Sequence, residues 1–155
     1  MIQRDSTVRL DFQSTFEMLD FVQVVSDHIG RLVGLDEDAV HWVGVAVRES
    51  VINAIKHGNA GDASKRVHVE FTPLEAESPR GLAVRVRDEG TGFDPSHLPD
   101  PLAPENILKS SGRGIFLIRS FMDRVELRPA PEGGMEVTMI KRADAGHEHV
   151  STSSP

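Results

Sequence analysis

The chain has 155 residues, of which 39% are hydrophobic, and its 24 acidic and 17 basic residues leave a formal net charge of -7. This length suits one domain with one core. The negative charge argues against a nucleic-acid partner held by its phosphates. The absence of cysteine excludes disulfides, thiolate metal sites and a cysteine nucleophile. Because no apolar run reaches the roughly 20 residues that span a bilayer and no signal peptide is evident, we expect a cytoplasmic protein without membrane contact.

The first part of the chain predicts one strand and two helices. Residues 7–12 alternate between apolar and polar side chains, as in a strand, and residues 16–33 carry apolar side chains at helical spacing. Asp36 suits the N-cap of a second helix over about residues 37–56, whose first turn holds acidic side chains that the helix dipole favours. The glycine-containing stretch 57–61 should end this helix.

The middle of the chain predicts a strand pair and a long loop. Residues 66–72 and 82–87 alternate in the same way and are joined by a Pro-, Glu- and Gly-containing connection, which indicates neighbouring antiparallel strands. Residues 94–111 contain several prolines and few apolar side chains, so we expect an irregular loop. Loops of this length are usually functional, and we interpret this one as a lid.

The last part of the chain completes the expected fold. Residues 113–122 have helical spacing, and residues 125–128 and 135–140 alternate around a glycine turn as a closing hairpin. Strands with few helices between them predict the α+β class, a two-layer sandwich with a mixed, mostly antiparallel sheet and its helices on one face. We expect residues 1–143 to form the domain and residues 144–155 to be a disordered tail.

The second predicted helix carries two different faces. Its apolar residues form a core stripe, while Glu49, Asn53, Lys56 and His57 share the opposite side within an arc of about 100°. A solvated helix face explains such charges in most helices. However, an asparagine oxygen is a hard neutral ligand that suits Mg²⁺, and a glutamate one turn away can accept a proton. His57 is equally suited to capping the helix and to contacting a phosphate.

A strand-end acid is followed by a glycine turn. Residues 84–87 lead into Asp88, which precedes Gly90 and Gly92 in an Asp-x-Gly-x-Gly pattern. The glycines permit close approach of a ligand to the backbone. A buried carboxylate at Asp88 could accept a hydrogen bond from the exocyclic amine of adenine, where guanine presents a carbonyl. Alone, the pattern is weak, because acidic glycine turns are common after strands.

A second glycine pair opens the third predicted helix. Gly112, Arg113 and Gly114 follow two serines at the expected helix start. Freed backbone N–H groups and the helix dipole make such a start a natural phosphate site, to which Arg113 and Lys109 would add positive charge.

Taken together and in this order, three segments resemble the N, G1 and G2 boxes of the GHKL (histidine-kinase-like) ATPase superfamily. They are Glu-Ser-Val-Ile-Asn-Ala-Ile-Lys-His-Gly at residues 49–58, Asp-Glu-Gly-Thr-Gly-Phe at 88–93, and Gly-Arg-Gly at 112–114. The resemblance spans about residues 7–142. Within the superfamily the chain looks most like the small anti-sigma-factor serine-protein kinases, including the final hairpin around residues 133–138.

The resemblance implies a Bergerat-type ATP-binding fold that takes ATP and Mg²⁺. Asn53 would then bind Mg²⁺, Asp88 would bind the adenine amine, and Gly90 and Gly92 would shape the pocket. It further implies that Glu49 is the general base for a protein serine hydroxyl. The remaining implied contacts are those of the phosphates with Gly112 and Gly114, and of adenine with Thr138.

The resemblance also implies partners: a sigma factor held inactive, an anti-sigma antagonist phosphorylated on serine, and a second copy in a homodimer. The sensor histidine kinases, which share the three boxes, are a rival interpretation. Such a kinase would need a dimerisation helix pair with a phospho-accepting histidine before the ATPase fold. The main alternative is a module of the same fold in which bound nucleotide gates protein binding without phosphoryl transfer.

Overall fold

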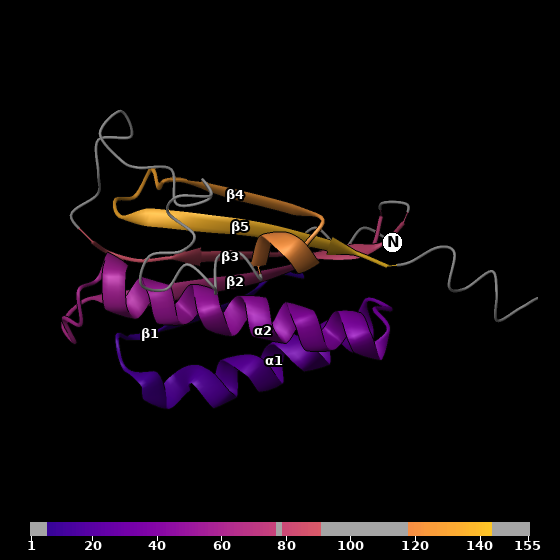
Figure 1. Cartoon of the computed structure of the whole chain (residues 1–155), viewed down its shortest axis with the longest axis horizontal. Coiled ribbons are helices and arrows are strands. Elements are labelled where there is room, and N and C mark those ends of the chain that lie inside the picture. Colours follow the sequence, from indigo (N-terminus) through magenta and orange to yellow (C-terminus); the bar gives the residue numbers. More distant parts are fainter. Residues whose placement is uncertain (1–5, 77–78, 91–117, 144–155) are drawn as a thin grey trace, which may run out of the picture.

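A computed structural model describes residues 6–76, 79–90 and 118–143 of the chain. Figure 1 shows a sheet with two long helices, α1 and α2, stacked on one of its faces. The described strands form one five-stranded sheet in the order β1-β2-β3-β5-β4, with antiparallel neighbours throughout. This arrangement confirms the predicted two-layer α+β class. The elements are β1 (Val8–Gln13), α1 (Leu19–Leu32), α2 (Glu37–Asn53), β2 (Arg66–Leu74), β3 (Gly81–Arg87), β4 (Arg124–Pro129) and β5 (Met135–Arg142).

The sheet has a buried face and an open face, as alternation in β2 illustrates. Val67, Val69 and Phe71 are completely buried beneath the helices. Arg66 and His68, on the alternate positions, lie on the open face because successive side chains of a strand point to opposite sides. The period of two that predicted this strand therefore also decides which side chains form the core.

The helices pack through the apolar stripe expected for α2. Its members Val40, Val43, Val47 and Val51 are all buried in the core between the sheet and α1. Asp36 caps α2 as predicted, because its Oδ1 accepts a hydrogen bond from the N–H of Ala39 at 2.8 Å. The free N–H groups of the first turn explain the preference for an acidic side chain there.

The end of α2 differs from the prediction. The α-helix ends at Asn53 rather than near residue 56, and a π-helical turn, η2 (Ala54–Gly58), follows it. The wider turn is closed by a hydrogen bond from the Asn59 N–H to the Ala54 carbonyl at 2.8 Å. Single π-helical turns are rare and are frequent at functional sites.

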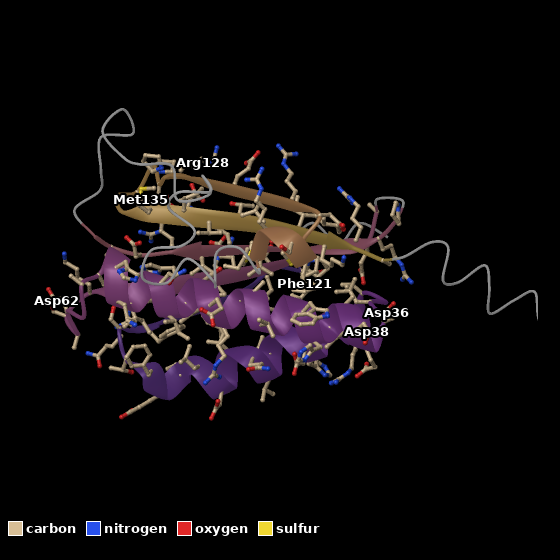
Figure 2. The ribbon with its side chains drawn as sticks, viewed as in Figure 1. Asp36, Asp38, Asp62, Phe121, Arg128 and Met135 are labelled. Atoms are coloured by element: carbon tan, nitrogen blue, oxygen red, sulfur yellow. The ribbon has the colours of Figure 1, made fainter. Side chains whose placement is uncertain are left out.

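The chain returns to the helix layer just before β4. Ile118 and Met122 are buried in the core, and the Phe121 ring stacks on Trp42 of α2 with centroids 3.8 Å apart and planes 6° from parallel (Figure 2). Helical structure is described from residue 118 to residue 121. The proposed lid at 94–111, most of the helix predicted at 113–122 and the tail at 144–155 lie outside the described residues. Within the described ranges, no helix combines the length and apolarity needed to cross a membrane.

Candidate functional site

The candidate site lies where β3 ends beside the π-helical turn. Asp88 follows β3 directly and is only 5% exposed. Its Oδ1 accepts hydrogen bonds from the N–H groups of Gly90, at 2.9 Å, and Met135, at 3.1 Å. In addition, its own N–H donates to the Met135 carbonyl at 3.0 Å. These contacts fix the orientation of the carboxylate and orient Oδ2 toward the helix layer.

Three glycines surround Asp88 where a larger residue would collide. A Cβ at Gly58 would lie 1.9 Å from Asp88 Oδ2, and a Cβ at Gly90 would lie 2.2 Å from the Gly58 carbonyl oxygen. Gly134 has φ of +79°, and its Cβ would lie 2.1 Å from the Asp88 carbonyl oxygen. Atoms do not approach this closely, so the packing around the carboxylate requires all three glycines. The sequence placed Gly58 at the end of the second helix, within the segment that resembles the N box, and Gly134 in the turn of the closing hairpin, but it did not predict their contacts with Asp88.

Asn53 presents a buried oxygen that no described residue contacts by a hydrogen bond. Its Oδ1 is inaccessible to solvent, and no hydrogen bond to it is found among the described residues. Leaving a buried acceptor unsatisfied costs about 1–3 kcal/mol, so this oxygen is suited to a ligand that the described residues do not supply. An amide oxygen at the end of a helix fits Mg²⁺, which takes oxygen ligands from protein and phosphate together. Within the described ranges there is no group of three or more His, Cys, Asp and Glu side chains that could hold a metal on its own.

Glu49 and His57 flank Asn53 along the same stretch of chain. Glu49 is half-buried on α2, one helical turn before Asn53, as the spacing predicted. His57 lies exposed in the π-helical turn, next to Gly58. The structure therefore brings Glu49, Asn53 and His57 to one end of the helix layer, the end at which Gly58 contacts Asp88. Figure 2 labels Met135 and Asp62 at this end of the molecule.

Thr138, for which the resemblance implies a contact with adenine, lies on the other face of the sheet from the Asp88 carboxylate, and that contact stays a prediction. It lies on β5 opposite Arg85, and it lines a surface pocket of about 380 Å³ on the open face of the sheet. Its neighbour Met139 is buried in the core, and the Asp88 carboxylate likewise lies on the helix side, against Gly58. The strand period of two places Thr138 and the Asp88 carboxylate on different faces of the sheet. Odd positions of β5 face the helices, whereas Thr138 faces away from the helices.

Asn59 is a site residue that sequence reasoning missed. It is completely buried, and its amide nitrogen donates to Ser14 Oγ at 2.6 Å and to the Arg66 carbonyl at 2.9 Å. Its amide oxygen accepts the N–H of Glu89 at 2.7 Å. One side chain thus joins the segment after α2 to the start of β2 and to the turn that carries Asp88. An asparagine among glycines reads as an ordinary turn residue, so no local signal distinguishes it.

The remaining predicted site residues lie outside the described parts of the chain. They stay predictions from the sequence: Gly92, Lys109, Gly112, Arg113 and Gly114.

Comparison with known proteins identifies the class that this fold and site define. Residues 12–141 match the family model of the histidine kinase-like ATPase domain. The chain belongs to this family. Two solved structures share its fold: the RsbU and RsbW domains of a Mycobacterium tuberculosis protein (TM-score 0.61, 16% identity) and a histidine kinase domain from Erythrobacter litoralis (TM-score 0.50, 17% identity). Each alignment covers 88% of this chain, but this chain spans only 32% of the first structure and 64% of the second.

Curated relatives indicate which members of the histidine kinase-like ATPase family this chain resembles. The chain is 35% identical over 137 residues to the anti-sigma F factor of Oceanobacillus iheyensis, covering 86% of this chain and 90% of that protein. It is 33% identical over 143 residues to the anti-sigma F factor of Clostridium perfringens, covering 89% and 97%. It is also 30% identical over 119 residues to the serine-protein kinase RsbW of Listeria monocytogenes, covering 73% and 72%. The resemblance to anti-sigma-factor serine-protein kinases is confirmed.

Proposed function

We propose that this protein is an ATP-dependent serine-protein kinase that acts as an anti-sigma factor. It would phosphorylate an anti-sigma antagonist on serine and hold a sigma factor inactive. The relatives named anti-sigma F factor and serine-protein kinase support this function over nucleotide gating without transfer. The observation that carries it is the buried Asp88 carboxylate, fixed by two backbone N–H groups and enclosed by glycines at the end of the helix that carries Glu49 and Asn53.

Asp88 would select the base. Its Oδ1 already accepts two backbone N–H groups, so the carboxylate is pre-oriented for a further donor. The exocyclic amine of adenine is such a donor, whereas guanine presents an acceptor at that position. A hydrogen bond to a charged group contributes about 1.5–3 kcal/mol, and opposing acceptors would be penalised by a similar amount. This difference would make the site specific for adenine nucleotides.

Asn53 would hold Mg²⁺ through its otherwise unsatisfied Oδ1. When bound, the ion supplies positive charge to the phosphate oxygens. We also propose that the N–H groups of Gly112 and Gly114 and the side chains of Lys109 and Arg113 contact the phosphates, as the helix-start pattern predicts.

Glu49 would act as the general base. In the transfer, the serine oxygen of the substrate forms a bond to the γ-phosphorus while the bond from that phosphorus to the ADP oxygen breaks. The hydroxyl proton passes to the Glu49 carboxylate, which leaves phosphoserine and ADP as products. Glu49 is half-buried one turn before Asn53, so a substrate hydroxyl near the metal ligand lies within reach of it.

The homodimer follows from the resemblance alone, whereas the location, the domain limits and the lid follow from the sequence pattern. We propose a homodimer, a cytoplasmic location, and a domain over residues 1–143 whose 94–111 segment is the lid.

The test is incubation with labelled ATP, Mg²⁺ and a purified antagonist-type domain, followed by detection of phosphoserine. Glu49→Gln should bind ATP as tightly as the wild type but transfer at least 100-fold more slowly, since general bases contribute about 10²–10⁴-fold. Gln keeps the size and loses the basicity of Glu. If the wild type binds ATP and never phosphorylates, nucleotide gating replaces the kinase proposal. If Glu49→Gln transfers at the wild-type rate, Glu49 is not the base.

A further inference from the structure

An ion-pair bridge on the open face of the sheet supports the turn that carries Asp88. His68 lies on β2, with only 19% of its side chain exposed, between two carboxylates. Its Nδ1 lies 2.5 Å from Asp11 Oδ1 on the edge strand β1, and its Nε2 lies 2.7 Å from Glu89 Oε2. Glu89 stands between Asp88 and Gly90, so the bridge reaches the turn that carries Asp88 from the open face of the sheet.

The geometry requires a particular protonation state. A carboxylate oxygen only accepts, so each ring nitrogen of His68 must donate in order to bond both carboxylates. Only the imidazolium, which carries protons on both nitrogens, can do so. Loss of either proton would leave a ring lone pair facing a carboxylate oxygen, which is repulsive. The bridge therefore forms fully only in the charged state of the ring.

Glu89 connects the charged ring of His68 to the turn that carries Asp88. Its Oε1 accepts the backbone N–H of Arg66 at 2.9 Å, and its own N–H donates to Asn59 Oδ1 at 2.7 Å. The hydrogen bond from His68, and then that from Arg66, lower the pKa of the Glu89 carboxyl, so it is ionised whenever the ring is charged. Both main chain and side chain of Glu89 are thus held, which restricts the backbone angles available to Asp88 and Gly90.

The charged surroundings of His68 come from three strands. Arg87 of β3 is its register partner and lies close enough to Glu89 to stabilise that carboxylate. On β2, Arg66 and Glu70 occupy the same open face two positions away on either side. The two arginines oppose a charge on the ring, while Asp11, Glu70 and Glu89 favour it.

We propose that His68 is a positioning residue of the nucleotide site, and that its imidazolium holds Glu89 and the adjacent Asp88 and Gly90 in the conformation that binds the base. This inference rests on the proposed nucleotide site. Nucleotide affinity should then be higher when the ring carries both protons than when it does not. An exposed ion pair with no such connection contributes little, so an effect on affinity is what distinguishes positioning from a surface contact.

The test is calorimetric titration of the full chain with ADP over a range from acidic to alkaline pH. We expect wild-type affinity to weaken by roughly 3- to 10-fold across this range, the size of one lost charge-assisted hydrogen bond. His68→Gln should bind more weakly at the lower pH and show a flattened profile. Glu89→Gln, which leaves the ring in place but removes its charged partner, should flatten the profile in the same way.

The matched control is His28→Gln, because His28 is an exposed histidine on α1. Its profile should follow that of the wild type. Titration of the ADP phosphate near pH 6 affects every variant alike, so comparison of the profiles separates it from the effect of His68. Thermal unfolding of each variant confirms that it is folded. If the wild type binds ADP and His68→Gln retains the wild-type pH profile, the positioning role is overturned while the nucleotide site stands. If the folded wild type binds no nucleotide at any pH, both proposals are overturned.

Discussion

Gly58 and Asp88 approach so closely that a Cβ on the glycine would lie 1.9 Å from the carboxylate oxygen Oδ2. They come from different layers, Gly58 from the π-helical turn after α2 and Asp88 from the end of β3. The contact joins the two parts of the candidate site: the helix end with Glu49 and Asn53, and the strand end with the acid that would bind the base. The π-helical turn allows it by directing the chain toward the sheet.

Gly58→Ala should therefore damage binding and stability together. The added methyl group has to displace the Asp88 side chain, and overpacking of this kind costs about 1–3 kcal/mol. We expect the free energy of unfolding to fall by that amount and ADP binding to drop below detection by calorimetry. The control is Gly61→Ala, because nothing lies within 4 Å of a Cβ there; its φ of +73° makes it strained but distant from Asp88. Equal ADP affinity in the Gly58 variant and the wild type would refute the contact.

Asp88→Asn tests base recognition with almost no change in shape. The amide keeps an oxygen for the Gly90 and Met135 N–H groups but replaces the other acceptor with a donor. We expect ATP affinity to fall at least tenfold, corresponding to about 1.4 kcal/mol. Guanine nucleotides should lose less affinity than adenine nucleotides, because their carbonyl accepts from the new amide. Competition titrations with ATP and GTP measure this shift, and an unchanged ATP affinity would exclude Asp88 as the adenine ligand.

Asn53→Ala should separate metal binding from folding. The substitution removes a buried oxygen that has no hydrogen-bond partner among the described residues, so the unfolding free energy should stay within about 1 kcal/mol of the wild type. The Mg²⁺ dependence of ATP affinity should be lost. Titrations with and without Mg²⁺ provide the readout. A variant that keeps the full Mg²⁺ effect would show that the oxygen does not serve the ion.

Asn59→Ala should lower the free energy of unfolding, in contrast to Asn53→Ala. It removes the partner of the Glu89 N–H, now at 2.7 Å, and one partner of Ser14 Oγ, now at 2.6 Å. We expect a loss of about 2–4 kcal/mol in unfolding free energy, measured by denaturant titration, since each buried group left unsatisfied costs about 1–3 kcal/mol. Asn53→Ala is the matched asparagine control. Equal stability of the two variants would contradict the structural role of Asn59.

Asp27 gives a pH dependence of stability with a definite sign. Burial raises the pKa of this α1 carboxyl, against the lowering effects of Arg31 and His41. Its Oδ1 has no hydrogen-bond partner among the described residues and lies against Gly44. Because the folded state holds the proton more tightly than the unfolded state, stability should decrease as pH rises from the ordinary aspartate pKa of 3.8 through the raised value.

Asp27→Asn should remove that decrease and stabilise the protein at neutral pH by up to about 1 kcal/mol, a small effect because the carboxyl is only partly buried. Thermal unfolding at several pH values measures it. Glu17→Gln, at an exposed position before α1, should leave the pH slope unchanged. An Asp27 variant that is less stable than the wild type at neutral pH would reverse the assigned sign.

The sequence by itself determined the fold class and the local chemistry. Periods of two and 3.6 residues reflect burial of one strand face or one helix stripe, so β2 and the core side of α2 could be predicted before the structure. Asp36 was identifiable as a cap for the same reason, because the cap and its N–H partner lie only three residues apart. Glu49 and Asn53 could likewise be placed together, since helical geometry alone relates them.

Only the tertiary structure decided how distant segments meet. The contact between Gly58 and Asp88, and the hydrogen bond from Glu89 to Asn59, each join residues that are thirty positions apart. The ion pairs of His68 with Asp11 and Glu89 form only when three neighbouring strands pair in register, so the sequence alone did not connect His68 to the site. Contacts of this kind depend on packing between layers, which local patterns do not encode.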